Sequence, residues 1–334
     1  MKRSKSAIAV GFTAAALLSG TWGSGIAGAD PAPAPSTRHT PQAAPAAAAN
    51  ICTQGAAPSG RKVPGQLSKA QVDKALGGQT KTHREARGWK KGGHAQHPLR
   101  QRESREPSKG VGPAEDIHPA QGTAFLQRAG NDGGCATQSV STRVNVTEGS
   151  TTIYTPTLYP AGGSCIELVT VYVRGRASVS AWDWCEAINF QASVPIDEAF
   201  LKRYSDGSSS PAYSGRVVRT DASTGTWTAE LYNHETGRWD ELYTKGGVTQ
   251  GRMDGWDIYE LYSSTNSQGR AYSCAAMAGQ VFESRDISVR NGGTWAAAAP
   301  ANSNTGYDQP DAAFKCPERT YQMLNQYDHW KAVG

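Results

Sequence analysis

The sequence IELVTVYVRGRASVSAWDW, residues 166–184, predicts two β-strands joined by the short turn RGR. β-Branched and aromatic residues favour strands, and successive side chains of a strand point to opposite faces of its sheet. In the first strand, Glu167 therefore shares a face with Val169, Val171 and Val173. A buried carboxylate needs a partner or a function, so this glutamate is a candidate site residue.

The chain beyond residue 135 continues as short alternating runs separated by Gly, Ser, Asn and Asp. The stretch TGTWTAELYNHETGRWDELY, residues 224–243, predicts a second hairpin with aromatic residues on both arms. Further strands are predicted at the stretches YSGRVVRT, GWDIYELYS and QVFESRDISVR. Roughly 200 residues of this pattern predict an all-β domain over residues 121–334, a two-sheet antiparallel β-sandwich of the concanavalin-like type.

Residues 1–29 have the pattern of a secretory signal peptide. Lys2, Arg3 and Lys5 precede an apolar stretch that ends in the small residues AGA, so we expect cleavage near Asp30 and a secreted, extracellular protein. No later run approaches the roughly 20 apolar residues of a membrane helix, so no membrane association is expected after signal removal. A monomer is expected.

Residues 30–120 are predicted to be a mostly disordered pro-segment or linker, because their Ala- and Pro-rich start has few large apolar side chains to bury. Within this arm, QLSKAQVDKAL predicts a short helix, since Leu67, Val72 and Leu76 are spaced at helical intervals.

Charge divides the chain into a basic arm and an acidic body. Residues 31–120 carry 14 Lys and Arg against 6 Asp and Glu (14 − 6 = +8), whereas residues 121–334 carry 17 against 22 (17 − 22 = −5). The arm could attract a polysaccharide or an anionic cell-wall polymer. A cationic pro-segment would also bind an acidic cleft at neutral pH and loosen as carboxylates gain protons, which predicts activation by acid.

Six cysteines in an exported chain favour disulfides over metal ligands. Cys52 lies in the arm and the other five lie in the body: Cys135, Cys165, Cys185, Cys274 and Cys316. Either Cys52 ties the arm to the body, or one body cysteine is free. The sequence contains no CxxC or HExxH motif, so neither a metal ion nor a cofactor is expected.

The stretch WDIYELYSS, residues 256–264, contains a second candidate glutamate, because Glu260 falls on the same strand face as Trp256 and Ile258. If Glu167 and Glu260 lie within a few ångströms in a poorly solvated cleft, their repulsion leaves them holding one proton between them at acidic pH. One carboxylate would then act as general base on a water and the other as general acid.

Each glutamate also has a purely structural interpretation. Glu167 could begin its strand near a solvated edge, and Glu260 could pair with an arginine such as Arg174, Arg176 or Arg270. Other catalytic arrangements have little support: five histidines, including His118, fall in the arm or at its border, and no GxSxG motif occurs.

The order of the segments SCIELVTVYVRGRASVSAWDWCE, TGTWTAELYNHETGRWDELY, WDIYELYSS, MAGQVFESRDISV and SNTGYD resembles that of the glutamic peptidases, particularly the neprosin-type domain. The resemblance covers roughly residues 150–310. It implies a β-sandwich with two catalytic glutamates, at Glu167 in CIEL and Glu260 in IYEL. A competing register would place Tyr154 at the first position, which implies a non-catalytic relative.

Together these observations predict a secreted, acid-favoured endopeptidase that uses no metal or cofactor and acts on protein or peptide substrates. Its catalytic residues would be Glu167 and Glu260, and Trp182, Trp184 and Trp256 would line the cleft. The alternative is a secreted β-sandwich that binds carbohydrate or cell wall without catalysis, because tryptophans also stack on sugars.

Overall fold

The computed structural model describes residues 50–86, 115–247, 251, 253–306 and 309–334. The predicted signal peptide lies outside the described residues, as does most of the predicted arm on either side of residues 50–86. Within the described part of the chain, two β-sheets face each other, which confirms the predicted β-sandwich.

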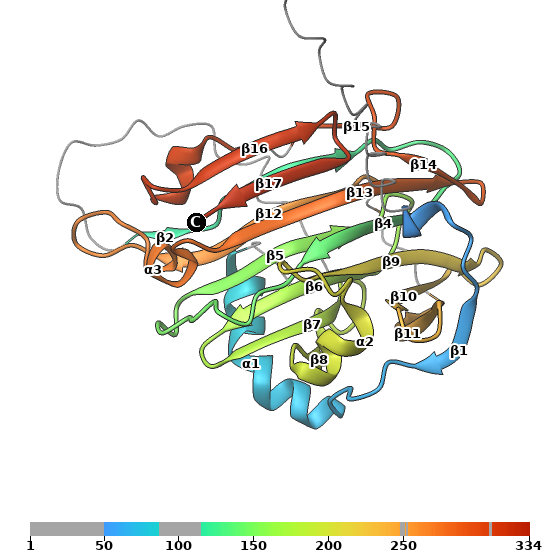
Figure 1. Cartoon of the computed structure of the whole chain (residues 1–334), viewed down its shortest axis with the longest axis horizontal. Helices are drawn as coiled ribbons and strands as arrows, with labels where there is room; N and C mark the ends of the chain where they lie inside the picture. The colour runs from blue at the N-terminus through green and yellow to red at the C-terminus, as the bar shows by residue number, and fades with distance from the viewer. Residues whose placement is uncertain (1–49, 87–114, 248–250, 252, 307–308) are drawn as a thin grey trace, which may run out of the picture. The chain divides into compact units, whose positions relative to one another are not determined.

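One sheet has nine strands among the described residues, and Figure 1 shows their course. Their order across the sheet is β1 (Pro58–Lys62), β11 (Arg238–Lys245), β10 (Thr226–Asn233), β9 (Ala212–Asp221), β4 (Asn131–Ser139), β13 (Val281–Asn291), β17 (His329–Val333) and β16 (Thr320–Asn325), with β14 (Thr294–Ala297) paired to β13. β10 and β11 are the arms of the second predicted hairpin, which is confirmed.

The other sheet has eight described strands. Their order is β15 (Ser303–Asn304), β3 (Ala120–Phe125), β12 (Gly255–Ser264), β5 (Thr152–Tyr159), β6 (Ile166–Val173), β7 (Arg176–Asp183) and β8 (Asn189–Pro195), with β2 (Asp116–Ile117) paired to β12. β6 and β7 are the predicted hairpin that turns at RGR, and they pair antiparallel along their whole length. This sheet is called the eight-stranded sheet below.

Short helical elements lie between the strands and before them. They are η1 (Ile51–Thr53), α1 (Lys69–Ala86), α2 (Glu198–Tyr204), α3 (Ser273–Met277) and η3 (Asp311–Phe314). α1 begins two residues after Leu67 and so confirms the helix predicted from QLSKAQVDKAL. No helix in the described ranges is long and apolar enough to cross a membrane.

Alternation along each strand of the eight-stranded sheet creates two buried layers. One side, with Leu168, Tyr172 and Tyr259, packs between the sheets in the larger hydrophobic core. The opposite side, with Val169 and Trp256, belongs to a second apolar cluster. We call this second side the outer face, because it is turned away from the nine-stranded sheet.

Residues 50–86 were grouped with the disordered arm from their composition, but the structure packs them onto the sandwich. β1 adds to the edge of the nine-stranded sheet by pairing in parallel with β11. Cys52 forms a disulfide with Cys135 of β4, so the arm cysteine does tie this segment to the body. Val63 is buried in the main core. These few apolar side chains meet apolar surface of the body, which composition alone does not reveal.

The described residues contain two further disulfides, Cys165–Cys185 and Cys274–Cys316, and none of the cysteines is free. The expectation of a disulfide-bonded protein is therefore confirmed, and the odd body cysteine is accounted for by the Cys52 bridge.

Asp257, on the inner side of β12, is a fully buried carboxyl group between the sheets. It accepts hydrogen bonds from Gln138 Nε2 at 2.8 Å and from Trp330 Nε1 at 2.9 Å. Burial raises the pKa of Asp257 to about 7, against the lowering effect of these hydrogen bonds. Because the folded pKa lies above the unfolded value, Asp257 stabilises the fold in acid, and this contribution is lost as pH rises from about 4 to about 7.

We therefore expect Asp257→Asn to remove part of the pH dependence of stability. The difference in unfolding free energy, variant minus wild type, should increase between pH 4 and pH 7, by up to about 4 kcal/mol for three pKa units. Urea unfolding at both pH values measures it, with the exposed Glu148→Gln as control. A constant difference would show that Asp257 does not titrate in this range.

Candidate functional site

β12 places alternate side chains in different surroundings, and this explains the carboxylate among its aromatic residues. Asp257, Tyr259 and Leu261 point between the sheets. Trp256 and Glu260 lie on the outer face, where Glu260 pairs in register with Ala120 of β3 and Tyr154 of β5. Glu167 lies on the same outer face of β6, as the alternation predicted. Both glutamates are 1% exposed.

Three described side chains donate hydrogen bonds to the Glu167 carboxylate. Thr157 Oγ1 and Trp256 Nε1 donate to Oε1 at 2.8 and 2.9 Å, and Trp184 Nε1 donates to Oε2 at 2.8 Å. These donors come from β5, β12 and the turn after β7, so three parts of the chain fix one carboxylate. Hydrogen bonds to an ionised acceptor are stronger than neutral ones, and together they hold its orientation.

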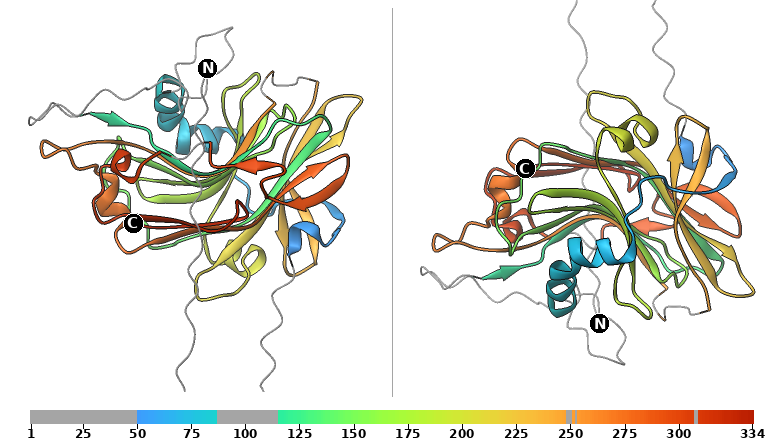
Figure 2. Two further views of the ribbon diagram at one scale, coloured as in Figure 1. Left: turned by 90° about the horizontal axis from the view of Figure 1, so that it is seen from above. Right: turned by 90° about the horizontal axis from the view of Figure 1, so that it is seen from below.

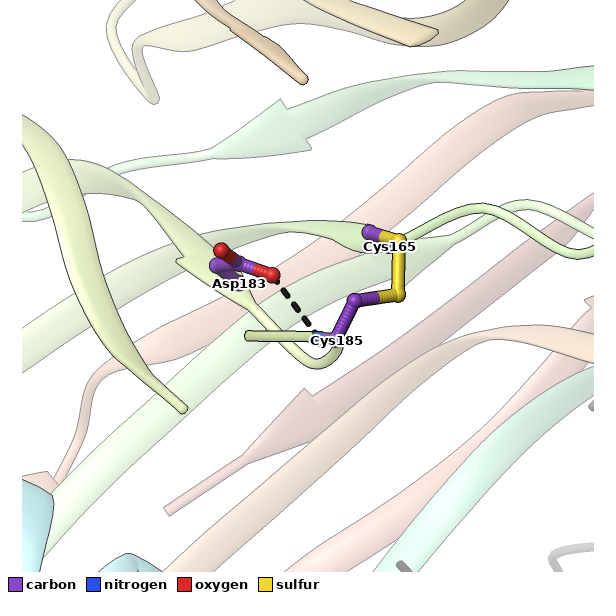
Figure 3. Close-up of side chains that lie close together, drawn as sticks. All are labelled: Cys165, Asp183 and Cys185. Atoms are coloured by element: carbon purple, nitrogen blue, oxygen red, sulfur yellow. Dashed lines mark hydrogen bonds between the residues drawn. A yellow bond between two sulfur atoms is a disulfide. The ribbon is translucent and has the colours of Figure 1, made fainter. Parts of the chain in front are cut away.

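A disulfide fixes the turn that supplies Trp184. Figure 3 shows Cys165, just before β6, bonded to Cys185, just after Trp184. Asp183 accepts hydrogen bonds from the backbone N–H groups of Cys185 at 2.8 Å and Ala187 at 3.3 Å. Cys165, Asp183 and Cys185 are close enough together to resemble metal ligands. Because the two sulfur atoms form a disulfide, we assign this cluster a structural role. The disulfide and the Asp183 hydrogen bonds hold the turn beside Glu167 in place.

The three predicted substrate-binding tryptophans surround Glu167. Trp182 pairs in register with Glu167 across β6 and β7, and its ring packs against Trp184 and Phe190. Trp256 stacks on Tyr159, with ring centroids 4.6 Å apart. All three tryptophans are buried. The structure thus brings together Glu167 and the tryptophans that the sequence singled out.

Glu260 has a different partner, which sequence reasoning missed. His118 Nε2 donates a hydrogen bond to Glu260 Oε2 at 3.1 Å, and the His118 side chain is 11% exposed. The two residues are 142 positions apart, and no local pattern links them. The arginines suggested as partners lie elsewhere: Arg270 pairs with Glu318, and Arg174 and Arg176 are exposed.

The strand register separates the two glutamates. Glu167 lies in the row that passes through Trp256, and Glu260 is four residues farther along β12 and two strands away from β6. Four residues at about 3.3 Å and two strand spacings at about 4.8 Å separate their Cα atoms by roughly 16 Å. The register thus places both glutamates on one face but in different rows, and the shared proton stays a prediction. The alternation along each strand correctly predicted the sheet face on which Glu167 and Glu260 lie. It carried no information on how far apart the two residues are on that face.

Tyr154, the residue of the competing register, also lies on the outer face. It is directly opposite Glu260 on the neighbouring strand, whereas the ring of donors surrounds Glu167.

α1 covers part of the outer face. Val72 and Leu76 of the helix are fully buried in the same apolar cluster as Trp182 and Phe190. Before the helix, Leu67 N–H donates to the carbonyl of Ser193 on the edge strand β8 at 2.9 Å. Figure 2 shows α1 on the side of the eight-stranded sheet away from the C-terminal strands β16 and β17. The N-terminal segment therefore occupies surface beside Glu167.

No protein-family description matches the chain, and no curated protein sequence matches it. Among solved structures, it is similar to SCP-B, a member of the eqolisin family of peptidases, in a complex with the tripeptide Ala-Ile-His, with 13% identity and a TM-score of 0.39. It is also similar to scytalido-glutamic peptidase with a peptide-based transition state analog, with 15% identity and a TM-score of 0.39. Each match covers 66% of this chain and 99% of the other. At these values the similarity is a remote one of fold and assigns no activity.

Proposed function

We propose that this protein is a secreted, acid-favoured endopeptidase whose water-activating residue is Glu167. One observation carries the proposal: a buried carboxylate is held by three hydrogen-bond donors among aromatic side chains, on a face partly covered by the chain's own N-terminal helix. A fixed carboxylate in a water-poor setting is suited to acid–base catalysis, because it reacts without first losing an ordered solvent shell.

The proposed reaction needs only a peptide and one water. Glu167 accepts a proton from the water as the water oxygen adds to the peptide carbonyl carbon. The resulting tetrahedral intermediate collapses, Glu167 returns the proton to the leaving nitrogen, and the C–N bond breaks. The products are a carboxylic acid and an amine, and Glu167 ends as it began. Trp184, Trp256 and Thr157 keep its carboxylate oriented throughout.

Glu260 is proposed as the second catalytic carboxylate, acting along the same bound peptide. A peptide lying across the outer face from Glu167 on β6 to Glu260 on β12 would meet both acidic groups, which the register separates by four residues and two strands. This arrangement assigns both proton transfers to Glu167, so loss of Glu260 should cost less activity than loss of Glu167. Trp182, Trp184 and Trp256 would contact the peptide side chains.

The N-terminal segment is proposed to be a pro-segment that keeps the outer face covered at neutral pH. Its basic arm, with 14 Lys and Arg against 6 Asp and Glu over residues 31–120, is attracted to an acidic body. Protonation of carboxylates at about pH 3.5 weakens that attraction. The described disulfides fit an extracellular location, and we expect a monomer.

A second candidate function is binding of a polysaccharide or an anionic wall polymer without catalysis. The aromatic cluster on the outer face favours it, because sugars stack on tryptophan rings. The rings of Trp182 and Trp256 are buried, so this function also requires α1 to move.

The test is a time course of the purified full-length protein shifted from pH 7 to about pH 3.5 in the presence of casein. Gel electrophoresis and mass spectrometry should reveal casein fragments and trimming of the N-terminal segment. Intact casein, with binding to insoluble polysaccharide after acidification, would reject the peptidase and support the binding function.

A further inference from the structure

We propose that His118 is the positioning residue of Glu260, which it contacts through Nε2. The inference deepens the proposed function and rests on it. His118 lies outside every sequence motif, and the mechanism assigned to Glu167 does not use it.

The contacts of His118 are those of a fixed side chain. Its Nε2 lies 3.1 Å from Glu260 Oε2, and the two side chains are 11% and 1% exposed. Its ring stacks on Tyr262, with centroids 3.8 Å apart and planes 18° from parallel. Tyr154 meets Tyr262 edge-on at 5.3 Å. The imidazole is therefore held by ring stacking on one face and by a hydrogen bond at Nε2.

The backbone on both sides of His118 is also fixed. The residue lies between β2 and β3, and both strands pair antiparallel with β12, the strand that carries Glu260. Ile117 pairs with Ser263, and Ala120 pairs with Glu260. The carbonyl of Pro119 accepts a hydrogen bond from Leu261 N–H at 3.3 Å. The histidine and the glutamate are thus on neighbouring strands in a set register.

The pairing has a clear chemical consequence. A carboxylate that accepts one N–H bond at Oε2 has its rotation fixed, so the direction of Oε1 is fixed as well. Glu167 is oriented in the same way, by donors from β5, β12 and the turn after β7. His118 therefore does for Glu260 what these donors do for Glu167.

Two variants separate the roles of His118. His118→Phe keeps an aromatic ring to stack on Tyr262 but has no donor for Glu260. His118→Gln keeps an N–H donor at the position of Nε2. We expect kcat for casein to fall about 10- to 100-fold in His118→Phe with KM changed less than about 2-fold, because a displacement of about 1 Å in a group that contacts the reacting peptide can cost about 100-fold. His118→Gln should recover most of the rate.

A double-variant cycle with Glu260→Gln tests whether His118 acts through Glu260. His118→Phe should not lower kcat further once Glu260 is replaced, and the urea midpoints of the single variants should not add. Additive losses in kcat and in midpoint would overturn the proposal, as would failure of His118→Gln to recover the rate.

The urea midpoints are measured without a catalytic assay. They therefore test the His118–Glu260 pair independently of the proposed peptidase function. A wild-type protein without peptidase activity would overturn the proposed function and the catalytic part of this inference together. Non-additive midpoints in that same protein would still support the His118–Glu260 pair, and additive midpoints would reject it.

Discussion

Glu167→Gln is expected to reduce casein cleavage at pH 3.5 by on the order of 10³-fold, within the range that general acid–base groups contribute. An amide cannot take the proton of the attacking water, so the loss should appear in kcat. Glu260→Gln should have a smaller effect, because Glu167 performs both proton transfers. Initial rates at saturating casein measure both variants.

The same substitution has a cost in stability that must be separated from its effect on catalysis. The NH2 group of the introduced amide, placed where Oε2 was, cannot accept the hydrogen bond that Trp184 Nε1 donates there. An unsatisfied buried donor costs about 1–3 kcal/mol. Adding Trp184→Phe removes that donor, so the double variant should regain unfolding free energy without regaining activity.

The exposed Glu148→Gln is the matched control, since it makes the same chemical change at an exposed position outside the strands. Wild-type casein cleavage by Glu167→Gln would reject the assignment of Glu167. Recovery of activity together with stability in the double variant would show that Glu167 acts only through folding.

The second large effect is expected from Val72→Asp combined with Leu76→Asp. Both side chains are fully buried between α1 and the outer face. Their replacement removes about 1.5–3 kcal/mol of apolar burial each and places two carboxylates against apolar surface. α1 should detach, while β1 and the Cys52–Cys135 disulfide keep the preceding segment in place. Casein cleavage should then begin at pH 7, at least about 10-fold above wild type.

Lys74→Asp is the control for this double variant, because it changes the net charge by the same −2 at an exposed position of the same helix. Tryptophan fluorescence reports detachment independently of activity, since Trp182 and Trp184 would gain contact with water. A shift in fluorescence without any gain in cleavage would show that α1 does not control access to the site. An unchanged spectrum would show that the helix stays bound.

Several features of this protein can be predicted from short-range patterns in the sequence, such as the two-residue alternation of a β-strand. Alternation along residues 166–184 was enough to predict the β6–β7 hairpin and to place Glu167 on the face opposite Leu168. The same period placed Glu260 with Trp256 and Ile258. Cysteine counting correctly raised a bridge from Cys52 to the body. These predictions succeed because strand geometry repeats every two residues and needs no knowledge of distant neighbours.

Tertiary structure alone decided which groups meet. Hydrogen bonding among β12, β5 and β6 places Glu167 level with Trp256 of β12. The sequence could not show this register, and so could not show that Glu260 lies four residues farther along β12. His118 reaches Glu260 only because β2 and β3 both pair with β12. Composition placed residues 50–86 in a disordered arm, whereas apolar contacts and a disulfide hold them on the sandwich. A local pattern specifies the face of a strand, but long-range pairing specifies the neighbours on that face.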